Sequence, residues 1–121
     1  MTHHNGDPEK VAKVIRIDNY HTGMFAYFLD KLRSTADGDG SLLDHSVIVY
    51  GAGLSDGNVH AHNNLPTLLV GGQAAQIKGC RHLRYAEGTP IANLFLSVLD
   101  KLGAAVENLG DSTGKLELLS V

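Results

Sequence analysis

One polar loop holds the residues of this chain that are best suited to chemistry. His60 and His62 lie two positions apart, so in an extended loop their rings project to the same side, and Asp56 precedes His60 by four positions. Imidazole and carboxylate groups suit zinc, manganese and iron, and a catalytic zinc commonly takes three protein ligands. The three residues therefore predict a whole or partial metal site. The alternative is a loop whose polar side chains only satisfy its own backbone through Asx-type turns.

Two short apolar runs flank this loop and must position it. Val47 to Tyr50 precedes the loop, and Thr67 to Val70 follows it and is closed by Gly71-Gly72. Both runs have the length and composition of buried strands. Open α/β sheets display their sites at the carboxyl ends of strands, so the arrangement favours a functional loop.

Two further groups of side chains are candidates for binding. His3 and His4 precede the first predicted helix; they are residues of a tag, a disordered end, or extra imidazoles beside a helix N-terminus that favours anions. Arg81, His82 and Arg84 form a basic patch. This patch either holds a phosphate, sulfate or carboxylate, or it lies on a solvated strand edge.

Local signals predict two helices around the apolar runs. Asp7-Pro8-Glu9 is a strong start for a helix that runs to about Ser34, and Thr89-Pro90 starts a second helix that runs to Leu102 before Gly103. A short strand at 79–85 and a strand or strap at 116–121 are also predicted. Each helix is expected to bury one face, formed by Val11, Val14, Ile15, Tyr20, Met24, Phe25, Phe28, Leu29 and Leu32 in the first and by Ile91, Leu94, Phe95, Val98, Leu99 and Leu102 in the second.

Helices that alternate with short apolar strands indicate the α/β class. We expect a small parallel or mixed sheet flanked by helices, in one domain that spans residues 1–121. A sheet this thin beside a long helix predicts that the chain is a piece of a larger α/β domain. Its exposed sheet edge or apolar face then predicts a homo-oligomer.

Composition narrows the classes of partner. The hydrophobic fraction of 43% and charged fraction of 19% are those of a folded globular protein. With a net charge of −3 and no run of Lys and Arg, neither nucleic acid nor an anionic-lipid surface is favoured, and no apolar stretch is long enough for a membrane span. The single cysteine, Cys80, excludes an internal disulfide and a four-cysteine zinc site.

Most of the chain resembles one bacterial protein family of unknown function. The segments that carry the resemblance are Thr2-His3-His4, DPEKVAKVIRIDNYHTGMFAYFLDKL, GDGSLLDHSVIVYGAGLSDGNVHAHNNLPTLLVGG, KGCRHLRY and GDSTGKL. They are similar to the C-terminal part of a family that is named for a His-x-x-Ser-His-His motif and whose members are mostly predicted to be exported. Here the first His of that motif is absent, and Thr2 stands in place of its Ser.

The strand–loop–strand is similar, more distantly, to the sulfatase and alkaline-phosphatase superfamily. That resemblance implies that Asp56, His60 and His62 occupy metal-ligand positions, with His3 and His4 as auxiliary ligands. It also implies a divalent metal (zinc, manganese or calcium) and a small-molecule phosphate or sulfate ester as substrate. The nucleophile would lie upstream of Met1, so this chain alone is expected to be inactive. The alternative is a non-catalytic binding or assembly module of an exported protein that retains the hydrolase scaffold.

Overall fold

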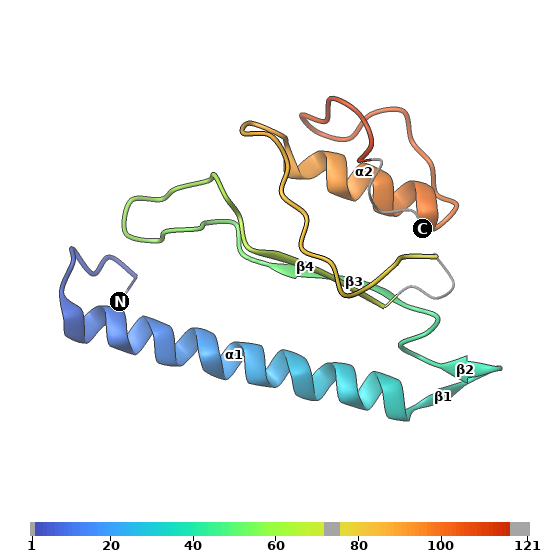
Figure 1. The fold of residues 1–121 in the computed structure, drawn as a ribbon, viewed down its shortest axis with the longest axis horizontal. Coiled ribbons are helices and arrows are strands. Elements are labelled where there is room, and N and C mark those ends of the chain that lie inside the picture. Colours follow the sequence, from blue (N-terminus) through green and yellow to red (C-terminus); the bar gives the residue numbers. More distant parts are fainter. Residues whose placement is uncertain (1, 72–75, 117–121) are drawn as a thin grey trace. The chain divides into compact units, whose positions relative to one another are not determined.

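The structure is a computed structural model that describes residues 2–71 and 76–116. Within these described residues, two helices and four short strands follow one another in the order α1, β1, β2, β3, β4, α2 (Figure 1). The α/β class predicted from the sequence is confirmed at this level. The chain divides into two compact units, Met1–Leu42 with Tyr50–Leu68 and Leu43–Val49 with Leu69–Val121. That all of it forms one domain stays a prediction.

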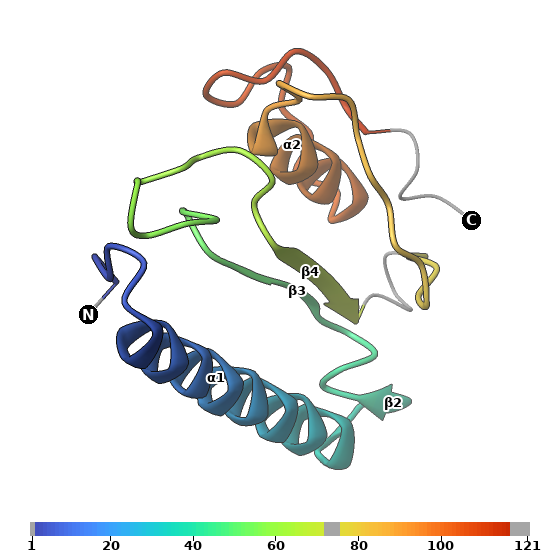
Figure 2. The ribbon, with the colours of Figure 1, turned by 60° about the vertical axis from the view of Figure 1, so that its left-hand side comes forward.

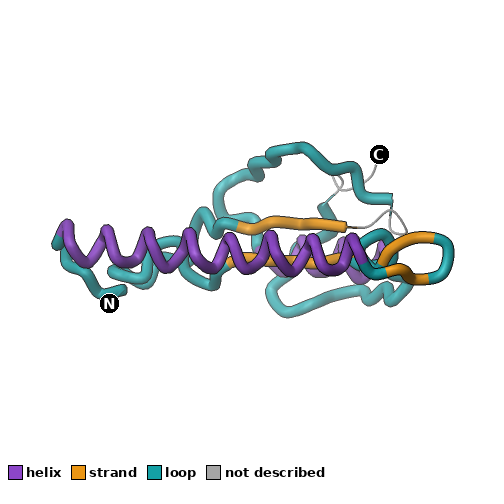
Figure 3. The backbone as a smooth tube through the Cα atoms, turned by 90° about the horizontal axis from the view of Figure 1, so that it is seen from below, coloured by secondary structure: helices purple, strands orange, loops and turns teal. Residues whose placement is uncertain are grey.

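The first helix, α1 (Pro8–Ser34), begins and ends where its local sequence predicts (Figure 3). The side chain of Asp7 accepts hydrogen bonds from the backbone N–H groups of Glu9 and Lys10, at 2.9 and 3.3 Å. These bonds satisfy two of the donors that a helix N-terminus leaves without partners. At the other end, the backbone N–H of Thr35 donates to the carbonyl of Leu32 and closes the last turn. Both predicted ends are confirmed.

The prediction that α1 buries one face, formed by all of its apolar residues, is wrong. No residue of this helix is fully buried. Phe25 and Leu29 are half-buried, and the ring of Phe25 stacks on that of Tyr50 with centroids 4.1 Å apart. Tyr20 and Met24 are exposed instead. At 100° per residue Tyr20 lies about 140° around the helix from Phe25, so the apolar residues form two faces rather than one.

Two small strands follow α1 in the same unit. β1 (Ala36–Asp37) pairs with β2 (Gly40–Ser41) in an antiparallel sheet, with Ala36 opposite Ser41. The turn between them uses Gly38 at a φ of 58°. A glycine adopts this left-handed conformation without the steric penalty of a side chain. The Asp/Gly-rich segment that precedes the main strands is therefore a tight hairpin.

The second sheet pairs β3 (Val47–Gly51) with β4 (Thr67–Gly71), and the two strands run in opposite directions (Figures 1 and 2). The start of β3 therefore lies beside the end of β4: a Cβ added to Gly71 would lie 2.3 Å from the carbonyl oxygen of Ser46. The parallel or mixed sheet predicted from the sequence is thus wrong. A parallel pair needs a crossover that carries the chain back to the other end of the sheet. Residues 52–66 instead fold back on themselves and return the chain beside the strand that it has just left.

The buried residues of the described chain lie on α2 (Ile91–Lys101), in the second unit. Phe95 was expected to face inward but is 38% exposed, whereas Leu96, which the spacing did not select, is 2% exposed. Gly103, at a φ of 74°, ends the helix as predicted, and its N–H donates to the carbonyl of Asp100. The buried positions are Ala92, Asn93, Leu96, Ser97 and Val98.

Two polar side chains in this buried set hold the segment that follows α2. Asn93 accepts a 2.8 Å hydrogen bond from the N–H of Thr113 and donates a 3.0 Å bond to its hydroxyl. Ser97 accepts a bond from the N–H of Leu116 at 2.6 Å and donates to the carbonyl of Asn93. Buried polar groups are stable when they are paired in this way. The predicted turn at 110–114 is thus fastened to α2 by side chains.

Other predictions have mixed outcomes. The strand expected at 79–85 is wrong, since these residues have no regular secondary structure. Of the strand or strap predicted at 116–121, residues 117–121 lie outside the described part of the chain. Among the described helices, neither α1 nor α2 combines the length and apolar character needed to cross a membrane.

Candidate histidine site

The loop between β3 and β4 closes into a narrow turn around Asn58. The N–H of Ser55 donates to the carbonyl of Ala61 at 2.9 Å, and the N–H of Ala61 donates to the carbonyl of Asp56 at 3.0 Å. Within this turn, the carboxylate of Asp56 accepts a 2.7 Å bond from the N–H of Asn58. An Asp side chain that accepts a hydrogen bond from the backbone N–H two residues later forms an Asx turn. One oxygen of Asp56 therefore stabilises the loop itself.

His60 occupies an unusual backbone conformation in this turn. Its φ is 54°, in the left-handed region, where a side chain at Cβ crowds the following carbonyl oxygen. Holding a non-glycine residue there raises the free energy of the folded chain by about 1 kcal/mol. Such residues often lie at functional sites, where the surrounding contacts outweigh the strain.

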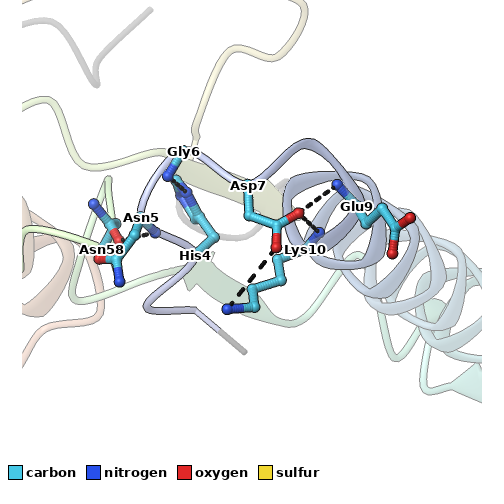
Figure 4. A network of polar contacts seen from close by, with 7 residues as sticks. All are labelled: His4, Asn5, Gly6, Asp7, Glu9, Lys10 and Asn58. Carbon is cyan, nitrogen blue, oxygen red and sulfur yellow. Dashed lines mark hydrogen bonds and ion pairs between the residues drawn. The ribbon is translucent and has the colours of Figure 1, made fainter.

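A short segment before α1 reaches this turn. We call residues 2–6 the N-terminal hook. Nε2 of His3 lies 2.9 Å from Nε2 of His60, with the two rings edge-on at 88° and their centroids 4.8 Å apart. The backbone N–H of Asn5 donates to the side-chain oxygen of Asn58 at 2.7 Å (Figure 4). The hook and the turn, which are more than 50 residues apart in the sequence, therefore meet through an imidazole pair and a hydrogen bond.

The bonding partners of His62 and His4 fix which nitrogen carries the proton when each ring is neutral. Nδ1 of His62 lies 3.1 Å from the carbonyl oxygen of Gly53, and a carbonyl can only accept, so Nδ1 donates and Nε2 keeps a free lone pair. His4 has the opposite arrangement, because its Nδ1 accepts from the N–H of Gly6 at 3.1 Å and the proton lies on Nε2 (Figure 4). His62 is thus prepared to act as a ligand, whereas His4 has to break a bond first.

The spacing of His3 and His60 also bears on the kind of metal that they suit. At a metal–nitrogen distance of about 2.05 Å, two nitrogens of a tetrahedral zinc lie about 3.3 Å apart. The observed 2.9 Å is shorter than this, and it is the length of a hydrogen bond between the two rings. Both rings are exposed, so an ion reaches them directly from solvent. The pair is therefore hydrogen-bonded as it stands, and its two nitrogens would have to move apart by about 0.4 Å to hold a tetrahedral zinc.

The five predicted ligands do not converge on one point. Over residues 2–71 and 76–116, no group of three or more His, Cys, Asp or Glu side chains is arranged to hold a metal ion. His3 and His60 meet, whereas Asp56, His62 and His4 each bond to a backbone group nearby. The assignment of all five residues to a metal stays a prediction.

The predicted anion patch is not assembled into a site either. The guanidinium of Arg81 donates twice to the carbonyl oxygen of Lys78, at 3.1 and 2.9 Å, and so braces its own loop. In the described part of the chain, no hydrogen bond or ion pair joins Arg81 to His82 or Arg84. All three side chains are exposed. Anion binding by this patch stays a prediction.

Two residues that the sequence interpretation did not single out matter for these loops. Asn58 joins the turn to the hook, and the high asparagine content of the loop was the available signal. Tyr85, beside the arginine patch, has a hydroxyl oxygen that is buried and has no hydrogen-bond partner among the described residues. Burial raises the pKa of Tyr85, and the positive charge of Arg81 offsets part of that rise.

Comparisons with protein-family models, with curated proteins and with solved structures found no match for this chain.

Proposed function

We propose that the chain contributes metal ligands to a hydrolase of phosphate or sulfate esters, with His3 and His60 as the central pair. The observation that carries this proposal is the 2.9 Å approach of their Nε2 atoms, made by residues at opposite ends of the first unit. Two neutral imidazoles at this distance share one proton, because one ring donates and the other accepts. A divalent ion would replace this hydrogen bond if the donor ring carried its proton on Nδ1 instead, because both Nε2 atoms would then offer a lone pair to the ion.

His62 is the third ligand in this proposal. Metal-binding histidines almost always donate their second ring N–H to a carbonyl or carboxylate, which fixes the ring and raises its basicity. The bond from His62 to the carbonyl of Gly53 has this form. Asp56 retains oxygen lone pairs beyond the one that accepts from Asn58, and so it is available as a fourth ligand. A rotation of these side chains within the exposed turn is required to complete the set.

The chemistry proposed for the site is that of metal-assisted ester hydrolysis. A bound divalent ion polarises the transferred group and lowers the pKa of a coordinated water or hydroxyl. The contribution of this chain is to hold the ligands: the turn fixes His60, Gly53 orients His62, and the hook brings His3 to His60. Zinc, manganese and calcium remain the candidate ions.

The proposal is tested by measuring the metal affinity of variants that each lack one histidine ring. Isothermal titration with Mn²⁺ and Zn²⁺ is expected to show one site, weakened at least tenfold by His3→Ala and by His60→Asn. Asparagine tolerates the left-handed backbone, so His60→Asn removes the ring without adding strain. His21→Ala, which removes an exposed histidine of α1, is the control and should bind as the parent does. Equal affinity in all variants would refute the assignment.

A non-catalytic module is the second candidate. It is favoured by the bonding of Asp56, His62 and His4 to nearby backbone groups, since a loop that satisfies itself needs no ion to hold its shape. Hydrolysis of p-nitrophenyl phosphate and p-nitrophenyl sulfate separates the two functions when it is measured on a longer, metal-loaded protein that carries this chain together with the expected upstream nucleophile, because this chain alone is expected to be inactive. Turnover that falls with His60→Asn supports the hydrolase, whereas metal binding without turnover supports the module.

A further inference from the structure

The helix α1 carries a second apolar face that the other described residues of its own unit do not bury. We call Ile17, Tyr20, Met24, Tyr27 and Phe28 the exposed stripe. Their exposed fractions are 40%, 66%, 47%, 58% and 47%. At 100° per residue the five side chains fall within about 100° of the helix circumference, and along the axis they span about 17 Å. They form one continuous band rather than scattered single residues.

The area of the stripe is large for a surface that meets only water. If a fully exposed side chain of this size offers about 200 Å², the stripe exposes about 500 Å². Soluble monomers rarely leave a contiguous apolar patch of more than a few hundred Å² unless it binds something. The stripe is therefore a candidate contact surface, and its flanking charges indicate the kind of partner.

Basic residues surround the stripe. The half of the α1 circumference centred on it carries four basic residues and one acid, Glu9. This face is thus positive on a chain whose net charge is −3. Two of the lysines lie in line with the stripe, one beyond each end, and the ammonium of the second lies 5.2 Å from the centre of the Tyr27 ring. The four basic residues are Lys10, Lys13, Arg16 and Lys31.

This charge disfavours a second copy of the chain as the occupant. In a parallel pair of α1 helices in register, Lys13 faces the partner's Lys13. In an antiparallel pair centred between Tyr20 and Met24, Lys13 faces the partner's Lys31 instead. Both arrangements bring like charges together at the two ends of the contact. A partner that accepts the whole face is apolar in the middle and negative on either side.

We propose that α1 lies flat on an anionic lipid bilayer, with the exposed stripe in the headgroup region. Tyrosine suits this depth because its ring is apolar and its hydroxyl stays wet. Lysine and arginine extend their apolar stems along the membrane while their charges reach the phosphates. A helix with an aromatic apolar face and basic flanks is typical of interfacial binding without a membrane span. This proposal is independent of the histidine site and does not rest on it.

Vesicle co-sedimentation tests the proposal on the intact chain. We expect binding to vesicles of 70% phosphatidylcholine and 30% phosphatidylglycerol, and little binding to pure phosphatidylcholine. The double variant Tyr20→Ser, Met24→Ser should lose at least tenfold in partition coefficient. Lys13→Gln should lose about fivefold, the effect of one surface charge near an anionic membrane. Ile15→Ser is the matched control, because Ile15 is 53% exposed on the same helix but lies outside the stripe.

Several results would overturn the proposal. One is no binding to the anionic vesicles; another is an equal loss in Ile15→Ser and in the double variant. A soluble polyglutamate that binds as strongly as the vesicles would show that any acidic polymer suffices. A dimer in light scattering without lipid, dissociated by the double variant, would show that the stripe binds a second copy. Circular dichroism of each variant establishes that α1 is still formed.

Discussion

The antiparallel pairing of β3 with β4 makes a sharp prediction at Gly71. This residue combines a φ of 87° with a close approach to the backbone, since an added Cβ would lie 2.3 Å from the carbonyl oxygen of Ser46. Gly71→Ala therefore introduces both left-handed strain, about 1 kcal/mol, and a clash with backbone atoms that cannot move aside. Overpacking of this kind adds about 1–3 kcal/mol. We expect Gly71→Ala to lower the free energy of unfolding by about 3 kcal/mol.

Two other glycines separate the two causes. Gly88 has a φ of 80° with nothing within 4 Å of an added Cβ, so Gly88→Ala reports the strain alone and should cost about 1 kcal/mol. Gly51 has no positive φ, but its Cβ would lie 2.6 Å from the carbonyl oxygen of Pro66, so Gly51→Ala reports the clash alone, about 2 kcal/mol.

Urea unfolding of the three variants, followed by circular dichroism, measures these differences. Gly23→Ala is a further control: Gly23 lies inside α1 with open space around it, so alanine there should stabilise by about 1 kcal/mol. If Gly71→Ala loses no more than Gly88→Ala, the close approach of β4 to Ser46 is absent. The antiparallel register would then be wrong.

Two more predictions concern the second unit. Tyr85→Phe removes an unpaired buried hydroxyl and should stabilise by about 1 kcal/mol in urea unfolding, with the exposed Tyr27→Phe as control. Because burial raises the pKa of Tyr85, the folded chain holds the phenolic proton more tightly than the unfolded chain does. The free energy of unfolding should therefore fall as pH rises above about 10. Tyr85→Phe should make this fall smaller. Asn93→Ala leaves the N–H of Thr113 unpaired and should cost about 2 kcal/mol in thermal or urea unfolding. Thr113→Ala removes only the hydrogen bond to the Thr113 hydroxyl and should lower the free energy of unfolding by about half as much. Equal losses in the two variants would show that the bond from the Thr113 N–H to Asn93 contributes nothing to stability.

The sequence predicted the elements whose determinants are local. The start of α1 follows from Asp7 and Pro8, and the stop after α2 follows from Gly103, because caps act within one helical turn. The direction of β4 has no local determinant, since the run 67–70 fits a parallel and an antiparallel strand equally well. The direction of β4 depends on how residues 52–66 fold. These residues turn back on themselves at the bridge between Asp56 and Ala61.

Helical faces were harder to predict than helices. The apolar residues of α1 satisfy the three-and-four spacing as one set, yet they separate into a half-buried face with Phe25 and an exposed stripe with Tyr20. Basic residues three or four positions apart do not form a run, so the linear sequence does not reveal the positive face of the same helix. Only the angular positions around the helix bring the stripe and its charges together.

The candidate site shows why residue types can be predicted while their grouping cannot. His60 and His62 are close in sequence, but the left-handed backbone at His60 turns its ring to His3 while His62 bonds to Gly53. The expectation that both rings project to one side assumed an extended loop, and the tight turn removes that condition. The contact that matters joins residues 57 positions apart and depends on the hook. Asn58 makes this long-range contact possible, because its side chain fixes the backbone of Asn5. If His3 and His60 hold a metal ion as proposed, Asn58→Ala should therefore weaken Mn²⁺ or Zn²⁺ binding in isothermal titration without removing a ligand.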